Sequence, residues 1–293
     1  MKQRREHGPK TRRFAGQTEL YEGQSAKRAS AGAEAQPHHT DASRADNLIY
    51  GVAPVLEALR AGQRAIERIT IAEGARHHRL RELSELARAA NVPVHKAPRA
   101  ELERVTGHAA HQGVVATVSP KRYADKEQLL DALVARIGTA DPPLIVVLDG
   151  VEDPRNLGAI IRTVECAGAQ AVFIPERRAA GLTETVAKAA AGALEHVPVA
   201  RVTNIARLLE ELKEKGIWVV GVEAGAEMSY TAWDWTQPCA LVFGSEGKGL
   251  HRLVREHCDA LVSIPQRGRL TSLNVSSAAA VALYEAVRQR TRD

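Results

Sequence analysis

The run Leu144–Leu148 constrains the fold of this chain more than any other stretch. It contains five consecutive aliphatic residues with no polar residue between them. A strand with one solvated face alternates apolar and polar side chains, so an unbroken run is typical of a central strand that is covered on both faces. Such strands occur in parallel sheets with helices on both sides. We therefore predict an α/β fold.

Two further apolar runs, Leu241–Phe243 and Ala260–Ile264, each end in a polar loop that contains glycine. Strands that stop in such loops are typical of the carboxyl edge of an α/β sheet, where ligands bind. We expect the active site at this edge, formed by the last quarter of the chain. Other strands are expected at residues 171–174, 197–200 and 218–222, and helices at 156–167, 182–191, 204–215 and from about 274.

A smaller α/β unit precedes this sheet. Strands are expected at residues 48–50, 66–72, 92–94 and 113–118, and helices at 54–61, 80–90 and 99–105. Strands that alternate with short helices favour a three-layer domain. We assign residues 47–120 to this domain, 121–143 to a charged, partly helical linker, and 144–293 to the larger domain.

Residues 1–46 differ from the rest in composition. They contain one Leu and no Ile or Val, and basic residues crowd the start. Such a segment cannot bury enough apolar surface to offset the entropy of ordering. We expect a disordered basic tail, which either contacts RNA phosphates or is a solvated segment with no specific role.

Composition excludes several classes of protein. The chain has three cysteines and no CxxC pair, which indicates buried, reduced thiols in a cytosolic protein. No run approaches the ~20 apolar residues of a membrane span, and no secretory signal follows the basic N-terminus.

His108 with His111, and His251 with His257, lack a third ligand, so we expect no metal site. The net charge of +5 modestly favours an anionic partner. We expect a soluble cytoplasmic protein.

The first segment that carries chemistry is Asp153–Thr163, which follows the buried run and opens a helix. Asn156 suits the N-cap of that helix, and Arg162 lies about one and a half turns further on. Aliphatic residues flank Arg162, so a partly buried guanidinium there needs a partner or a substrate. Alternatively, Arg162 emerges at the surface and pairs with Glu152 or Glu165.

The second segment, Phe243–Leu250, holds three glycines within six residues. Glycine lets backbone amides approach a ligand closely. Lys248 is followed by glycine rather than Ser or Thr, so the segment is not a P-loop, and the chain has no GxGxxG after a strand, which disfavours a Rossmann site. Glu246 can orient a donor or an arginine; the alternative is a flexible surface turn.

The third segment is Ile264–Ser276. Arg267 and Arg269 stand in a glycine-containing loop and suit phosphate contacts. Ser272 and Asn274 precede the last helix, where they are either functional or simple helix caps.

Together the three segments resemble motifs 1, 2 and 3 of the SpoU/TrmH class of RNA ribose 2′-O-methyltransferases, in order and in spacing. The matching sequences are NLGAIIRT, FGSEGKGL and IPQRGRLTSLNVS. IYGVAPVLEAL and HQGVVATV in residues 47–120 are similar to the substrate-binding domain of that family. Within the family, the chain is most similar to bacterial enzymes that methylate a guanosine of 23S rRNA.

This resemblance implies a fold and a cofactor. The carboxyl-terminal domain would be a parallel-sheet SPOUT domain with a deep trefoil knot, an exception to the rule that chains avoid knots. The loops at 244–250 and 264–273 would form the knot. S-adenosylmethionine would bind in it, contacted by the backbone at Gly244, Ile264 and Leu273. The amino-terminal domain would be L30e-like and bind RNA, and the protein would be a homodimer packed through its carboxyl-terminal domains.

The resemblance also implies an activity, the S-adenosylmethionine-dependent methylation of a ribose 2′-hydroxyl in 23S rRNA, at a guanosine in the peptidyl-transferase region. The methyl donor is already cationic, so no metal is required. Arg162 would hold the oxyanion of the hydroxyl, because a nearby positive group favours the anionic form. Asn156 and Asn274 would position Arg162 or the ribose, and Glu246 would hold the second loop or an arginine.

One departure and several alternatives remain. Gln266, Arg267 and Arg269 are larger and more charged than the family pattern leads us to expect, which leaves the RNA contact surface open. Alternative activities are methylation of another rRNA nucleotide or of tRNA. A non-catalytic RNA-binding factor is disfavoured by the intact motifs, and a nucleotide-cofactor oxidoreductase by the missing glycine fingerprint.

Overall fold

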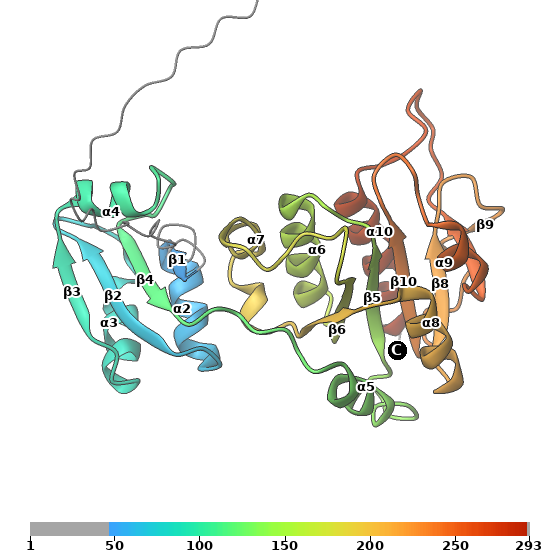
Figure 1. The fold of residues 1–293 in the computed structure, drawn as a ribbon, viewed down its shortest axis with the longest axis horizontal. Coiled ribbons are helices and arrows are strands. Elements are labelled where there is room, and N and C mark those ends of the chain that lie inside the picture. The colour runs from blue at the N-terminus through green and yellow to red at the C-terminus, as the bar shows by residue number, and fades with distance from the viewer. Residues whose placement is uncertain (1–46, 292–293) are drawn as a thin grey trace, which may run out of the picture. The chain divides into compact units, whose positions relative to one another are not determined.

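The computed structural model describes residues 47–291 (Figure 1). The basic tail predicted for residues 1–46 lies outside the described residues. The chain forms two separate sheets, one before and one after the segment 121–143.

The amino-terminal sheet has four strands in the order β1-β4-β2-β3. Its strands are β1 (Leu48–Tyr50), β2 (Ile66–Ala72), β3 (Val94–Ala97) and β4 (Val114–Val118), and its helices are α2 (Val52–Ala61), α3 (Leu80–Ala89) and α4 (Arg99–Val105). Successive residues of a strand face opposite sides. Val114 and Ala116 therefore join one core with residues of α2 and α3, whereas Val115 packs with Leu102 of α4. Helices cover both faces of this sheet, which confirms the three-layer prediction.

The carboxyl-terminal sheet has seven parallel strands in the order β7-β6-β5-β10-β8-β11-β9. The strands are β5 (Leu144–Asp149), β6 (Ala171–Pro175), β7 (Val199–Val202), β8 (Trp218–Val222), β9 (Met228–Ser229), β10 (Cys239–Gly244) and β11 (Ala260–Ser263). The helices are α5 (Lys126–Val134), α6 (Pro154–Cys166), α7 (Glu184–Ala190), α8 (Ile205–Glu214), α9 (Arg252–Glu256) and α10 (Val275–Arg290), with a short 3-10 helix η1 (Ala193–Glu195).

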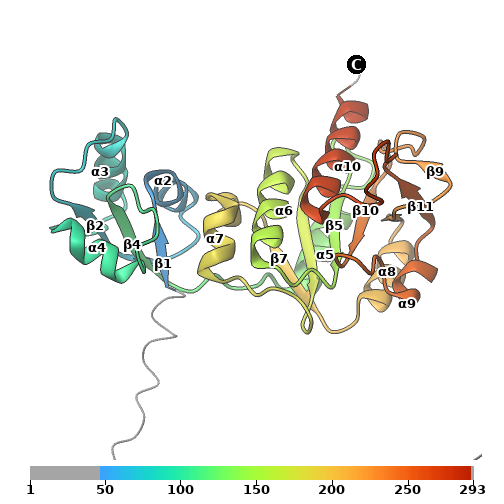
Figure 2. The same cartoon turned by 90° about the horizontal axis from the view of Figure 1, so that it is seen from above.

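Strand β5 is a central strand, as its unbroken aliphatic run predicts, and all of its residues are buried. Leu144, Val146 and Leu148 pack in a core with α6, α7 and α10. Ile145 and Val147 face the opposite core, with α5 and α8. Figure 2 shows α6 and α10 on one side of the sheet and α8 and α9 on the other. A parallel sheet with helices on both faces confirms the α/β class.

The start of α6 differs from the prediction, because Asn156 is not its N-cap. The cap is Asp153, whose carboxylate accepts a hydrogen bond from the backbone N–H of Arg155 at 2.8 Å. Pro154 follows at the first helical position, where the missing N–H needs no partner. Helix α6 therefore begins two residues earlier, and the buried side chain of Asn156 is available for other contacts.

Three short elements, α9, η1 and β9, were not predicted. None exceeds five residues, which is shorter than the window over which apolar periodicity can be read. No helix within residues 47–291 combines the length and the apolar content that crossing a membrane requires.

All three cysteines are free thiols. Burial raises the pKa of Cys239 to about 12 and also that of Cys258 to about 12, so both are protonated at neutral pH. The prediction of burial is wrong for Cys166, which is exposed at the end of α6.

Candidate active site

The loop after β10, Ser245–Leu250, closes on itself. Ser245 and Gly249 exchange two backbone hydrogen bonds, each 3.0 Å long. A Cβ on Gly244 would overlap the backbone of Gly249, so only glycine fits at that position. Gly247 and Gly249 have φ angles of 79° and 68°, which glycine adopts without strain. The glycines of the second segment therefore build a tight loop.

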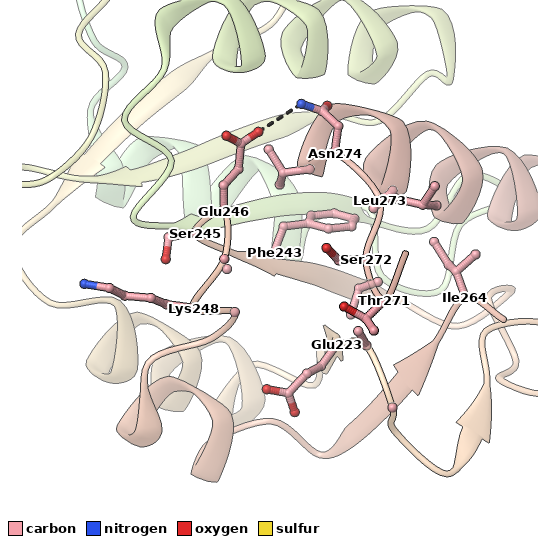
Figure 3. Close-up of a pocket in the computed structure, with 18 of the residues that line it drawn as sticks. Glu223, Phe243, Ser245, Glu246, Lys248, Ile264, Thr271, Ser272, Leu273 and Asn274 are labelled. Atoms are coloured by element: carbon pink, nitrogen blue, oxygen red, sulfur yellow. Dashed lines mark hydrogen bonds between the residues drawn. The ribbon is translucent and has the colours of Figure 1, made fainter. Parts of the chain in front are cut away.

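This loop forms one wall of a cavity of about 660 Å³ at the carboxyl edge of the sheet (Figure 3). Gly244, Ile264 and Leu273, the three residues expected to contact the cofactor, all line it. The cavity combines apolar side chains such as Phe243 with polar loop residues such as Thr271. A pocket of this size, with mixed lining, suits a nucleoside-sized ligand.

A further wall, Glu223–Gly225, was not singled out in the sequence. It follows β8 and lines the same cavity. The Glu223 carboxylate accepts a hydrogen bond from Nε of Arg255 at 2.7 Å, which ties this wall to α9. The signal was present, because residues 218–222 were predicted to be a strand and a glycine-containing segment follows them.

A polar cluster joins the three motifs. The Asn156 side-chain amide donates a hydrogen bond to Oε1 of Glu246 at 2.6 Å, and the Asn274 amide donates to the same oxygen at 2.9 Å. Asn274 also donates to Oδ1 of Asn156 at 3.0 Å. Figure 3 shows Glu246 and Asn274 facing one another. The fold thus brings together residues that are up to 118 positions apart in sequence.

Asn274 is the N-cap of α10, and its side chain also contacts the other two motifs. Its Oδ1 accepts from the backbone N–H of Ser276 at 2.9 Å and caps α10, while its amide belongs to the polar cluster. Ser272 lines the cavity of about 660 Å³.

A second cavity, of about 230 Å³, lies next to the polar cluster. It is lined by Gly150, Val151, Glu152, Asp153, Asn156, Ser245, Glu246 and Lys248. Ser245, Glu246 and Lys248 also line the larger cavity. The two cavities therefore meet at the loop after β10, an arrangement that can bring two ligands together.

A buried carboxylate at the end of β5 holds this loop in place. Oδ2 of Asp149 accepts from the backbone N–H of His251 at 2.7 Å, and Oδ1 lies 2.9 Å from Nδ1 of the same histidine. The sequence did not point to this pair, because the residues are 102 positions apart.

Arg162 is the one predicted catalytic residue that the fold does not bring to the polar cluster. Its side chain is exposed on α6, as in the alternative in which Arg162 emerges at the helix surface. It forms no ion pair or hydrogen bond with any residue in 47–291, and therefore does not pair with Glu152 or Glu165. The helix turns Ile160, Ile161 and Val164 into the core and leaves the arginine on the outer side.

Arg267 and Arg269 are exposed as well, in the loop between β11 and α10. In the part of the chain that the structure describes, no group of three or more His, Cys, Asp or Glu side chains is placed to hold a metal ion.

Two family models match the chain. The model of the SpoU rRNA Methylase family matches residues 143–284, and that of RNA 2'-O ribose methyltransferase substrate binding matches residues 48–124. The putative TrmH family tRNA/rRNA methyltransferase YacO of Bacillus subtilis is 45% identical over 249 residues, which cover 85% of this chain and 98% of the relative. The 23S rRNA (guanosine-2'-O-)-methyltransferase RlmB of Pseudomonas putida is 48% identical over 243 residues, which cover 83% and 96%.

Solved structures are similar over most of the chain. The SpoU methyltransferase AviRb from Streptomyces viridochromogenes in complex with AdoMet is 27% identical, with a TM-score of 0.67 over 83% of this chain and 90% of that chain. An RNA 2'-O ribose methyltransferase is 28% identical, with a TM-score of 0.70 over 83% and 88%. Since the identity extends over nearly the whole of the curated relatives, the chain belongs to the SpoU rRNA methylase family and is an RNA ribose 2′-O-methyltransferase.

Proposed function

We propose that this enzyme transfers a methyl group from S-adenosylmethionine to a ribose 2′-hydroxyl of 23S rRNA, at a guanosine in the peptidyl-transferase region. The observation that carries the proposal is the polar cluster of Asn156, Glu246 and Asn274 where the two cavities meet. The relatives named RlmB in Pseudomonas putida and Pseudomonas aeruginosa, at 48% and 44% identity, support the choice of 23S rRNA and guanosine.

The larger cavity is the proposed site for S-adenosylmethionine, which supplies an activated methyl group when bound. Gly244, Ile264 and Leu273 would hold it, since all three line the cavity. The absence of a side chain at Gly244 lets a ligand approach the backbone closely. The AdoMet complex of AviRb supports this cofactor.

The smaller cavity is the proposed site for the target ribose. Glu246 accepts from two amides, which fixes its carboxylate at the boundary between the cavities. Transfer requires the hydroxyl to be in line with the methyl group, so positioning is the main task of this cluster. Lys248 lines both cavities and is exposed.

Arg162 is the proposed stabiliser of the 2′-oxyanion or of an adjacent phosphate. It lies six residues beyond Asn156 on α6, about 9 Å along the helix axis. A guanidinium that has no carboxylate partner can bind an anionic ligand without first breaking an ion pair. Arginine stays protonated, so we assign it the electrostatic role and not that of a general base.

We further propose the family's architecture for this chain. The domain boundaries would be residues 47–120, 121–143 and 144–293, the first domain L30e-like and the last a trefoil-knotted SPOUT domain. The two matched family models, at 48–124 and 143–284, support two domains joined by a linker. An rRNA substrate implies a cytoplasmic enzyme, and a homodimer packed through the carboxyl-terminal domains is expected.

The test is transfer of a radiolabelled methyl group to rRNA from a strain that lacks the enzyme, with the site mapped by primer extension. A 2′-O-methyl group leaves the neighbouring phosphodiester resistant to alkali. The expected result is one alkali-resistant phosphodiester, next to a labelled guanosine of 23S rRNA. The Arg162→Ala variant should not transfer the label. A base-located methyl would refute the ribose assignment. Because the Bacillus subtilis relative is named a tRNA/rRNA methyltransferase, a tRNA sample is included, and labelling of tRNA alone would favour that substrate.

A further inference from the structure

The loop after β6, Glu176–Thr183, lies next to the proposed ribose site. Strand β6 pairs with β5 in parallel, so the carboxyl ends of the two strands are about 4.8 Å apart. The backbone N–H of Ala180 donates to the carbonyl of Val151, which lines the smaller cavity, at 3.0 Å. The loop is therefore directly connected to the wall of that cavity.

Further contacts fix the backbone of this loop at both ends. The N–H of Glu176 donates to the carbonyl of Val202 on β7 at 2.9 Å. The N–H of Leu182 donates to the hydroxyl of Tyr123 at 3.0 Å. Both ends of the loop are thus anchored to neighbouring segments.

The loop presents two exposed arginines, Arg177 and Arg178, between these anchored ends. Arg178 has a φ of 57°, in the left-handed region that side chains with a Cβ disfavour. Its side chain makes no hydrogen bond or ion pair within residues 47–291 that would compensate for this conformation. Backbone strain of this kind is concentrated at functional sites.

A third arginine, Arg201 of β7, adjoins the loop. Its guanidinium stacks 4.0 Å from the ring centroid of Tyr123. It also lies close to Gly181 of the loop, because a Cβ placed on this glycine would be 3.3 Å from one guanidinium nitrogen. Stacking on an aromatic ring orients a guanidinium while leaving its N–H groups free to donate. The guanidinium is therefore placed beside the loop, on the strand next to β6.

The pairing of arginines in the carboxyl-terminal sheet is uneven. Some are paired with carboxylates, as in Arg136–Asp141, Arg207–Glu211 and Arg252–Glu256. Arg290 instead donates to backbone carbonyls, and Arg155, Arg162, Arg267 and Arg269 have no carboxylate partner within residues 47–291. Arg177, Arg178 and Arg201 have no such partner among the described residues, although the loop itself contains Glu176. Cations that are fixed in place but not neutralised by the protein are suited to an anionic ligand.

We propose that Arg177, Arg178 and Arg201 form a binding site for phosphates of the RNA strand that flanks the target nucleotide. The ligand is a phosphodiester backbone because a planar guanidinium matches phosphate oxygens with two hydrogen bonds, and because the site continues from the ribose cavity through Val151. The proposal rests on the RNA substrate of the proposed function.

The experiment measures binding of the full-length protein to a transcript of the 23S peptidyl-transferase region, by fluorescence anisotropy at several KCl concentrations. The variants are Arg177→Ala, Arg178→Gly, Arg201→Gln and the double variant R177A/R178G. Glycine is chosen at position 178 because it keeps the left-handed backbone while removing the charge. The matched control is Lys215→Ala, an exposed cation that precedes β8 at the opposite edge of the sheet.

Each arginine variant should raise Kd for RNA about tenfold, the effect of losing one charge-assisted hydrogen bond. The slope of the logarithm of the association constant against log salt should become less negative by about 0.7 for each phosphate contact removed from a single strand. Affinity for S-adenosylmethionine, measured by calorimetry, should not change. Lys215→Ala should bind RNA like the wild type.

The proposal is overturned if R177A/R178G binds S-adenosylmethionine normally and its RNA affinity and salt slope match those of Lys215→Ala. It is likewise overturned if the arginine variants lose RNA affinity with no change in the salt slope. Failure of the proposed function looks different: the wild type would then bind the transcript but transfer no methyl group to it.

Discussion

At the scale of single residues, the most informative contacts are those of Glu246. One carboxylate oxygen accepts from the amides of both Asn156 and Asn274, so this side chain links the three motifs. The cluster exists only because the start of α6, the loop after β10 and the start of α10 meet.

Glu246→Ala should lower kcat for methyl transfer about 10²-fold, because a small misplacement of a positioning group has an effect of that size. Glu246→Gln keeps an acceptor oxygen for the two amides and should fall between Ala and the wild type. Single-turnover transfer at saturating S-adenosylmethionine measures this. Glu256→Ala, which removes an exposed carboxylate from α9, is the control. Unchanged transfer by a folded Glu246→Ala would refute the positioning role.

A second residue-scale prediction concerns His257 at the end of α9. Hydrogen bonds to the Leu253 carbonyl at 2.7 Å and to Glu210 at 2.8 Å raise the pKa of its imidazole. A raised pKa in the folded state stabilises the protein below the unfolded pKa, and this contribution is lost as pH rises through the folded value. His257→Gln should therefore reduce the free energy of unfolding in acidic buffer but not in alkaline buffer. The loss should be at most about 1 kcal/mol, the upper value for such surface pairs.

Urea denaturation of wild type and His257→Gln at about pH 5.5 and about pH 9 tests this prediction, since the unperturbed imidazole pKa of about 6.5 lies between the two conditions. An equal loss of stability at both pH values would show that the side chain acts through packing and not through its charge.

At the scale of elements, the loop after β10 depends on where its glycines stand. A Cβ at Gly244 meets the backbone of Gly249, whereas a Cβ at Gly247 meets nothing within 4 Å. The two positions therefore separate steric exclusion from backbone strain.

Gly244→Ala should destabilise the protein by about 1–3 kcal/mol, as overpacking does, and should abolish binding of S-adenosylmethionine because the closed loop must open. Gly247→Ala should cost only about 1 kcal/mol, the strain of a positive φ, and should keep much of the binding. Thermal unfolding and calorimetry measure the two effects. Equal losses in the two variants would mean that the closed shape of the loop is not required.

At the scale of the whole molecule, one face of α10 exposes two large apolar side chains. Val281 and Tyr284 lie about one turn apart and are 36% and 50% exposed. Helix α10 packs against α6, which carries Arg162. Apolar side chains grouped on one face favour association, and this face supports the expected homodimer through the carboxyl-terminal domains.

We expect sedimentation velocity to show a dimer for the wild type and a monomer for the double variant V281E/Y284E. Two buried, unpaired carboxylates are too costly for a stable interface. Leu253→Glu is the control, because Leu253 is 52% exposed on α9, on the other face of the sheet. A dimer that persists in the double variant would place the interface elsewhere.

The sequence by itself determined the α/β class and the location of the site. An unbroken aliphatic run such as Leu144–Leu148 indicates a strand that is buried on both faces. A glycine-containing loop after such a run indicates where the strand ends. Both features are local properties of the chain. Gly244, Ile264 and Leu273 were expected at the cofactor site from the family resemblance, and all three line the larger cavity.

Only the tertiary structure decided the remaining features. Asn156 matched an N-cap in its local pattern, yet it binds Glu246, because β10 lies next to β5 in the sheet. The cavity wall at Glu223–Gly225 depends on the order of the strands in the sheet. The exposure of Arg162 depends on which face of α6 packs against the core. Strand pairing decides which residues about a hundred positions apart come into contact. Apolar periodicity within one segment does not predict that pairing.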